Sequence, residues 1–238
     1  MIHGISQVHT PLLCVPGKFP STRFRKINIT KKEQMIKQFA YLIVVRFNNI
    51  KCKYFNTFIS QSKCKIISKG RYDNGRVISA DYLEIVLTDL DFNFICCAYE
   101  FESYEFKEVY YSLYDYLPIE FVNFILDKYE NKTKYKKVPG KESIYAIEKS
   151  KFNALYGMSV TNNIKDEVLF DNDMGWSEEK IDNEVILEKL QKEYKDGFLS
   201  FSYGVFITAW ARTNLLYNII KLDKYCVYRR YRFIEIIW

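Results

Sequence analysis

The chain has 238 residues, of which 48% are hydrophobic, which allows one sizeable core and argues against an intrinsically disordered protein. Its formal net charge of +6 is a mild pointer to a polyanionic partner. The six cysteines form no C-x-x-C pair, which argues against a zinc site and a disulfide framework and indicates a reducing, cytoplasmic location. The longest apolar run, residues 39–45, is too short to span a bilayer, so no membrane partner is expected.

The first half of the chain is typical of β-strands. Residues 1–17 have no clear period, and residues 18–32 are basic. Residues 39–47 and 78–87 are rich in β-branched and aromatic side chains, which predicts two strands. The Asn-Gly pair within residues 71–76 is the strongest short signal for a hairpin turn.

The second half of the chain is typical of helices. A helix is expected from Pro118 to residue 129, where apolar residues recur at helical spacing. A basic loop at 131–141 and a second helix at 141–155 would complete a helical hairpin. The remaining expected elements are a weak helix within the polar residues 162–195, a long apolar helix at 204–222 and a strand that begins at Tyr225.

The segment that carries chemistry reads Y-A-I-E-K-S-K-F-N-A-L-Y-G, at residues 145–157. On a helix, Lys149, Asn153 and Tyr156 lie at i, i+4 and i+7 and therefore share one face. An ammonium group, an amide and an aromatic ring on one surface suit a nucleotide. Gly157 has no Cβ, so it either ends the helix or allows a nucleic-acid strand to approach closely. An ordinary amphipathic helix with a Tyr-Gly end explains the same spacing.

This segment resembles the B motif of family B DNA polymerases, K-x-x-x-N-S-x-Y-G, with Ala154 in place of the usual serine. Further segments resemble the viral and organellar members of that family, which prime replication from a protein. In chain order they are K-F-P at 18–20, R-F-R-K-I at 23–27, N-G-R-V-I-S-A at 74–80, L-T-D-L-D-F at 87–92, Y-L-P at 116–118, Y-E-N-K-T at 129–133 and G-V-F-I-T-A-W-A-R at 204–212.

The resemblance implies an α+β fold, with a partial polymerase palm built on an antiparallel sheet, helical-hairpin fingers and an inserted β-rich subdomain. Residues 1–17 and 229–238 are expected to be an out-of-frame N-terminus and an out-of-frame tail. Between them the resemblance implies a palm segment at 18–29, a terminal-protein-type insertion at 30–115, fingers with the B motif at 116–160, a second insertion or linker at 161–202, and a palm helix with the start of the C-motif strand at 203–228.

The resemblance also implies the parts of a nucleotide site. Lys149 would contact the triphosphate of the incoming dNTP, and Asn153 and Tyr156 would border the nascent base pair, next to Gly157. Lys132 would be a second phosphate-facing lysine, unless it is a solvated lysine of the basic loop.

Contacts with the DNA template and primer are expected elsewhere on the chain. Arg212 stands among apolar residues, where it would be a DNA-side cation or would extend its charge to solvent. The other expected DNA contacts are Lys134, Lys136 and Lys137. The parent enzyme would also engage the terminal protein that supplies the priming hydroxyl, in the cytoplasm of a phage-infected bacterium.

The metal ligands of the family are missing. Its members hold two divalent ions, Mg²⁺ or Mn²⁺, on aspartates of an A motif, D-x-x-S-x-Y-P, and a C motif, Y-x-D-T-D-S. The first aspartate here is Asp73, and arginines follow Tyr228, where the C motif belongs. No catalytic residue and no metal site are therefore expected in this chain, which would be inactive as it stands.

Both ends of the chain become similar to the family in a neighbouring reading frame. A coding sequence for Y-G-D-T-D-S with one added nucleotide reads Y-R-R-Y-R-F, which is the sequence of residues 228–233. One choice of codons for residues 5–11 gives D-F-T-S-S-Y-P in the adjacent frame. A frameshift at each end explains both matches, with an assembly error or real decay of the gene as alternatives.

Two functions stay open at this point. The chain is either a fragment of a DNA-directed DNA polymerase, a nucleotidyltransferase that replicates phage or plasmid DNA in its intact form, or a non-catalytic module derived from one. Such a module would bind nucleic acid or the terminal protein. An unrelated α+β protein with an accidental motif does not explain the ordered matches.

Overall fold

The computed structural model describes residues 19–159, 167–171, 175–179, 182–196, 201–230 and 233–236. The chain divides into two compact units, one made of Met1–Leu126 and Phe206–Trp238 and the other of Asp127–Val205. The predicted out-of-frame N-terminus at 1–17 lies outside the described residues. Each unit is described by itself below.

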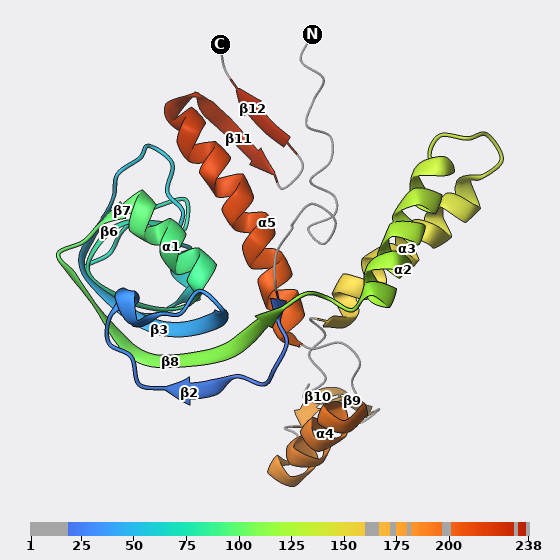
Figure 1. Cartoon of the computed structure of the whole chain (residues 1–238), viewed down its shortest axis with the longest axis horizontal. Helices are drawn as coiled ribbons and strands as arrows, with labels where there is room; N and C mark the ends of the chain where they lie inside the picture. Colours follow the sequence, from blue (N-terminus) through green and yellow to red (C-terminus); the bar gives the residue numbers. More distant parts are fainter. Residues whose placement is uncertain are drawn as a thin grey trace. The chain divides into compact units, whose positions relative to one another are not determined.

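The first unit contains an eight-stranded antiparallel sheet, which curls around a short helix (Figure 1). The main strand order is β1-β8-β3-β6-β4, and β2, β5 and β7 pair with β8, β6 and β3. The strands are β1 Phe19–Pro20, β2 Arg25–Ile27, β3 Phe39–Cys52, β4 Cys64–Ser68, β5 Arg71–Asp73, β6 Arg76–Thr88, β7 Tyr99–Glu100 and β8 Ser103–Asp115. The enclosed helix is α1, Asp89–Ala98.

The core of this unit fills the space between the sheet and α1. Alternate residues of β3, among them Ile43, Val45 and Phe47, are fully buried, as expected where one face of a strand packs on a core. Phe92 of α1 is also fully buried, and its ring lies 6.1 Å from that of Phe47 and 5.3 Å from that of Phe106. The two strands predicted at 39–47 and 78–87 are thus confirmed as parts of β3 and β6.

The turn predicted within residues 71–76 is confirmed. Asn74 and Gly75 both have positive φ angles, 44° and 70°, between β5 and β6. Two successive left-handed residues give the turn twist that a tight hairpin requires, and Asn-Gly adopts them at the lowest cost.

Helix α1 was not predicted; it follows directly on β6, the strand predicted at 78–87, which ends at Thr88. Thr88 caps the helix, because its hydroxyl accepts the N–H of Asp91 at 3.1 Å. Asp89 and Asp91 then lie in the first turn, where the helix dipole favours negative charge. Strand β6 therefore ends at Thr88, the residue that caps α1.

Strand β8 was also missed, because a β-bulge interrupts its alternation. Val44 of β3 pairs with Glu108 and Val45 with Phe106, so Lys107 is an extra residue in β8. Phe106 and Val109 then both face the core although they are three residues apart. The period of two, which identifies strands in a sequence, is lost at this point.

Helix α5, Phe201–Leu222, continues into the first unit, and the long helix predicted at 204–222 is confirmed. Its buried side chains include Phe206 and Ile219. The ring of Phe206 lies 6.2 Å from Phe24 and 6.0 Å from Tyr114. The apolar side of the helix is thus buried.

A short hairpin follows α5. It consists of β11, Cys226–Arg230, and β12, Phe233–Ile236, paired antiparallel. The strand predicted from Tyr225 is confirmed, one residue later. Residues 229–230 and 233–236, expected to be part of an out-of-frame tail, belong to this hairpin.

The second unit holds most of a helical hairpin, α2 Ile119–Lys134 and α3 Glu142–Ser159 (Figure 1). Both predicted helices are confirmed and are longer than predicted. A two-stranded hairpin, β9 Glu167–Asp171 and β10 Gly175–Glu179, was not predicted, whereas α4, Asn183–Asp196, is the expected weak helix. The α+β class with an antiparallel sheet is confirmed, and no helix in the described ranges is long and apolar enough to cross a membrane.

Candidate nucleic-acid interface

One face of α3 presents the cation and the amide that the motif predicts. Lys149 and Asn153 are exposed and lie one helical turn apart. The ammonium group of Lys149 lies 5.8 Å from the centre of the Tyr145 ring, one turn before it, within the range of a cation–π contact. Tyr156 lies on α3 at the predicted position, but its side chain lies outside the described part of the structure.

Gly157 does not end its helix. Helix α3 continues to Ser159, so the prediction that Gly157 is a helix terminus is wrong. A Cβ at this position would meet no atom within 4 Å, so the packing around α3 does not require a glycine there. Close approach of a nucleic-acid strand stays a prediction for this position.

The end of α2 holds two lysines that were expected in a loop. Lys132 and Lys134 lie in the last turn of α2, and the expectation that the loop begins at residue 131 is wrong. Lysines are favoured at a helix C-terminus because they interact with the helix dipole, and the Thr133 hydroxyl also donates to the carbonyl of Tyr129 at 2.8 Å. The Lys132 ammonium lies 4.8 Å from the Tyr129 ring.

The loop between the helices presents two further predicted lysines. Lys136 and Lys137 are exposed, and Lys137 has a positive φ of 62° that turns the chain after α2. Gly140, at φ 75°, completes the loop before α3. The loop and the two helix ends that it joins are therefore lined with positive charge.

An acidic side chain of α3, Glu148, forms an ion pair with α2. Glu148 of α3 has only 12% of its side chain exposed, and it contacts Lys151 at 3.0 Å and Lys128 of α2 at 3.7 Å. Lys128 also contacts Asp127 at 2.7 Å, and this hydrogen bond lowers the pKa of Asp127. Lys128 and Lys151 are thus paired with carboxylates of the hairpin, whereas Lys149 is exposed on α3.

Arg212 has a carboxylate partner that the sequence did not reveal. Its Nε and Nη2 donate to the two oxygens of Asp91 at 2.8 and 2.6 Å. The Thr88 hydroxyl donates to Asp91 as well, at 2.9 Å. This bidentate pair joins α5 to α1. Thr88-x-x-Asp91 has the spacing of a helix-capping motif, which was a signal for the start of α1 but not for the partner of Arg212. A DNA contact by Arg212 stays a prediction, with two of its donors already engaged.

Another carboxylate of α1 is buried against aromatic residues. Asp89 is 9% exposed and accepts the hydroxyl hydrogen of Tyr114 at 2.9 Å. Burial raises the pKa of Asp89 to about 6, and the Tyr114 hydrogen bond opposes that rise. The same burial, with the neighbouring Asp89 charge, raises the pKa of Tyr114.

The described residues do not form a metal site. Within these ranges no group of three or more His, Cys, Asp and Glu side chains could hold a metal ion. Strand β11, where the C-motif aspartates would lie, carries Arg229 and Arg230 instead. The residues present therefore do not fit the two-metal centre that the resemblance implies.

No protein-family model matches the sequence, and no curated protein matches it. Solved structures do match: the chain is similar in fold to part of a DNA polymerase. Phi29 DNA polymerase complexed with single-stranded DNA aligns with 99% of this chain and 37% of its own length, at a TM-score of 0.65 and 15% identity. The same polymerase complexed with primer-template DNA aligns with 90% of this chain and 33% of its own, at a TM-score of 0.64 and 16% identity.

A third structure, the ternary complex of Phi29 DNA polymerase with primer-template DNA and incoming nucleotides, aligns with 90% of this chain at a TM-score of 0.60 and 17% identity. The chain spans about a third of the length of the polymerase that it matches. At these identities the comparison establishes the shared fold.

Proposed function

We propose that the chain is a fragment of a family B DNA polymerase of the viral or organellar, protein-primed type. The observation that carries the proposal is the α2–α3 hairpin, in which K-x-x-x-N-x-x-Y-G lies on α3 and exposes Lys149 and Asn153. It is supported by the fold shared with Phi29 DNA polymerase over 90% or more of this chain. In the intact parent, the activity is template-directed nucleotidyl transfer during DNA replication.

The proposed roles follow the chemistry of each side chain. Lys149 contacts the triphosphate of the incoming nucleotide, because an exposed ammonium group on a helix face can meet its negative charge. Asn153 and Tyr156 border the nascent base pair, and Gly157 leaves room beside them. Lys132 is a second phosphate contact, whose ammonium already lies against the Tyr129 ring. DNA phosphates meet the exposed lysines that follow it, Lys134, Lys136 and Lys137.

The proposed domain roles keep the order along the chain. Residues 18–29 and 203–228 belong to the palm, 116–160 to the fingers, and 161–202 to a second insertion or linker. Residues 30–115, which form strands β3 to β8 of the curled sheet, are the insertion that engages the terminal protein. The host is a phage-infected bacterium, and the protein acts in its cytoplasm.

The parent enzyme would use Mg²⁺ or Mn²⁺ to stabilise the charge that develops on the transferred phosphoryl group. This chain's own residues bind and orient the nucleotide and the DNA, since its described part contains no group of side chains that could hold a metal ion. We therefore propose that the chain by itself is inactive. A second candidate function is a non-catalytic module that binds nucleic acid or the terminal protein, and the lysine-rich hairpin without metal ligands favours it.

The two candidate functions differ in the nucleotide sequence of the gene. Reading the other two frames should reveal the A motif before residue 18 and D-T-D-S near codon 230. Should no frame encode D-T-D-S there, the frameshift idea fails and the binding module becomes the better interpretation. A gene with both frames restored and joined to its flanking sequence should extend a primer with Mg²⁺ or Mn²⁺, whereas the 238-residue chain should not.

The role of Lys149 can be tested in the restored enzyme. Lys149→Ala should lower the rate of nucleotide incorporation about 10²-fold, because charge stabilisation of the transferred phosphoryl group is lost. Lys151→Ala is the matched control, since Lys151 lies on the same helix and pairs with Glu148 at 3.0 Å. Equal loss in both variants would contradict the proposed role of Lys149.

A further inference from the structure

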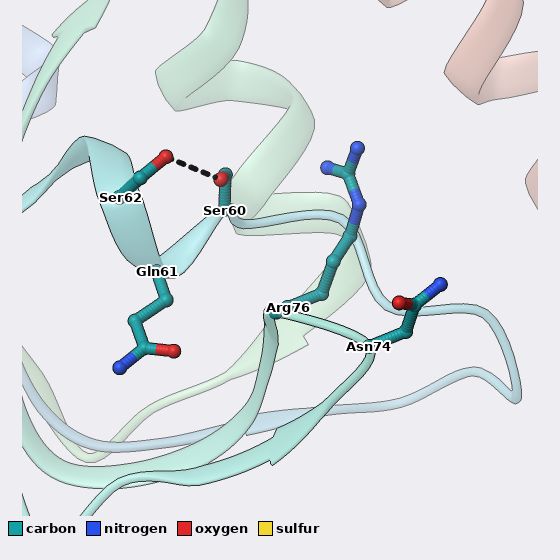
Figure 2. Close-up of a pocket in the computed structure, with 6 residues that line it drawn as sticks. Ser60, Gln61, Ser62, Asn74 and Arg76 are labelled. Atoms are coloured by element: carbon teal, nitrogen blue, oxygen red, sulfur yellow. Dashed lines mark hydrogen bonds between the residues drawn. The ribbon is translucent and has the colours of Figure 1, made fainter.

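A polar pocket of about 570 Å³ lies at the end of the sheet in the first unit, far along the chain from the α2–α3 hairpin (Figure 2). Its lining comes from two short segments, the chain before β4 and the Asn-Gly hairpin turn. The lining residues are Ser60, Gln61, Ser62, Asn74, Gly75 and Arg76. Each of them is polar or a glycine, and no carboxylate is among them.

The two segments are joined by main-chain bonds. The N–H of Gln61 donates to the carbonyl of Gly75 at 3.0 Å, and Ser60 and Arg76 form a β-bridge. Arg76 also donates from Nη1 to the carbonyl of Phe58 at 2.7 Å, which fixes its guanidinium at the pocket. Figure 2 shows Arg76 extending between Ser60 and Asn74.

The hydroxyl of a buried tyrosine, Tyr99, connects the two segments. Tyr99 is 1% exposed, and its hydroxyl accepts the N–H groups of Phe58 and Ile59 at 3.0 and 3.1 Å. The same hydroxyl donates to the carbonyl of Val77, next to Arg76, at 3.0 Å. Because one phenol ties both segments together, the pocket keeps its shape without a ligand, and less order must be imposed on binding.

The donors of the pocket suit an anion with several oxygens. The guanidinium has five N–H donors, of which the Phe58 carbonyl takes one, and hydroxyl and amide groups surround it. The charge of the segment agrees, since residues 61–76 contain five cations and one acid. The cations are Lys63, Lys65, Lys69, Arg71 and Arg76, the acid is Asp73, and Lys69 also pairs with Asp81.

An aromatic ring in the same segment favours a nucleic acid over an acidic peptide. Tyr72 is 40% exposed and stands between Arg71 and the turn. Its ring lies over Gly70, where any Cβ would collide with it. A basic surface with an exposed aromatic ring is the usual design of a single-strand binding site, because phosphates meet the cations and a base stacks on the ring.

We propose that this pocket binds a phosphate of a single-stranded nucleic acid on the sheet. The site goes beyond the function proposed for α3 and does not depend on it. Arg76 and the Ser60–Ser62 hydroxyl pair hold the phosphate oxygens; the two hydroxyls lie 3.0 Å apart and share a hydrogen bond, so one of them keeps its hydrogen for the phosphate. The lysines around the pocket attract the neighbouring phosphates.

The test adds a negative charge to the pocket without removing a contact that holds the fold. Gln61→Glu is nearly isosteric, and the Gln61 side chain is exposed. Gln38→Glu is the matched control, since Gln38 is an exposed glutamine of the same unit that does not line the pocket. Asn74→Asp is a second pocket variant, because aspartate also tolerates the left-handed conformation of this turn. Thermal unfolding confirms that all variants fold.

The measurement is the fluorescence anisotropy of a labelled oligothymidylate of about 16 nucleotides, at several salt concentrations. Gln61→Glu and Asn74→Asp should each weaken binding roughly fivefold or more, and Gln38→Glu by less than about twofold. All variants are repeated in a chain with Lys136→Gln and Lys137→Gln, which lowers binding by the helical hairpin.

Four results would overturn the pocket proposal. If the pocket variants and the Gln38→Glu control bind alike, or if the chain does not bind the oligonucleotide, the pocket is not a phosphate site. Loss of binding only through the Lys136 and Lys137 changes would place all binding on the hairpin, which leaves the proposed function intact. If poly-glutamate displaces the oligonucleotide as well as unlabelled oligothymidylate does, the pocket serves an acidic protein instead.

Discussion

The first unit, or sheet unit, and the α2–α3 helical hairpin use their charged side chains in opposite ways. In the sheet unit, Arg212 of α5 is bound by both oxygens of Asp91, and Asp89 is buried beneath Tyr114. In the hairpin, Lys149 extends from α3 into solvent above the Tyr145 ring. Both cations belong to segments that resemble polymerase motifs, yet only one of them is already neutralised by the protein. A cation with an internal carboxylate stabilises the fold, whereas an exposed cation has charge to offer a ligand.

The largest effect on stability is expected from an aromatic ring in the core of the sheet unit. Phe92→Ala should lower the free energy of unfolding by about 3–5 kcal/mol, because it empties a fully buried site between Phe47 and Phe106. Urea denaturation measures this change. Phe55→Ala, at a ring that is 76% exposed, is the control and should change stability by less than about 0.5 kcal/mol. Equal effects at the two positions would mean that α1 is not the centre of the core.

The buried carboxylate of α1 should make stability depend on pH. Burial raises the pKa of Asp89 from 3.8 to about 6, so the folded state binds this proton more tightly than the unfolded state. The contribution of Asp89 to stability therefore falls as pH rises from about 4 to about 6 and stays low above that. Asp89→Asn removes this dependence, and its stability relative to the parent should rise by roughly 2 kcal/mol between pH 4 and pH 7.

Denaturation curves of both proteins across this pH range measure that difference. Carboxylates with lowered pKa values, such as Glu105 and Glu108, are present in both proteins and cancel. A difference that does not change with pH would show that Asp89 is ionised in the folded protein at pH 4, as an exposed aspartate is.

The Arg212–Asp91 pair should contribute less than the core. Arg212→Met should cost about 2 kcal/mol, because it leaves the Asp91 carboxylate, 12% exposed, without its cation. The effect is reduced because water reaches the Arg212 side chain, which is 37% exposed. A double-mutant cycle with Asp91→Asn measures the coupling. Additive losses would show that the two side chains do not act as a pair.

The smallest effect is expected on α3. Lys149→Gln should change the stability by less than about 0.5 kcal/mol, because an exposed lysine over the Tyr145 ring contributes little to folding. Thermal unfolding of this variant beside Arg212→Met measures the contrast directly. A loss as large as that of Arg212→Met would remove the distinction between the two cations.

The sequence predicted the elements whose signals are local. The Asn-Gly turn, the two long strands and the hairpin helices each depend on neighbouring residues, and each was found where it was expected. Helix α1 was missed because Thr88 ends a strand and caps a helix at once. Strand β8 was missed because the bulge at Lys107 breaks its period, which becomes visible only beside β3.

The candidate site shows the same limit. The face shared by Lys149 and Asn153 follows from helical spacing, so sequence alone could predict it. The partner of Arg212 could not be predicted, because Asp91 lies on a different helix far away in the chain. The pocket at Arg76 was missed for a similar reason, since the chain before β4 meets the hairpin turn only in the folded sheet, through main-chain bonds and the Tyr99 hydroxyl.

Strand β3 also determines how early the sheet can be completed as the protein is synthesised. It lies between β6 and β8, and its first residue, Phe39, pairs with Leu113 in β8. While the ribosome makes the residues between them, one edge of β3 has no partner and can pair with another chain. Long-range pairing of this kind folds slowly, so a chain that stalls before β8 should aggregate, whereas one that stalls after Asp115 has every strand of this sheet.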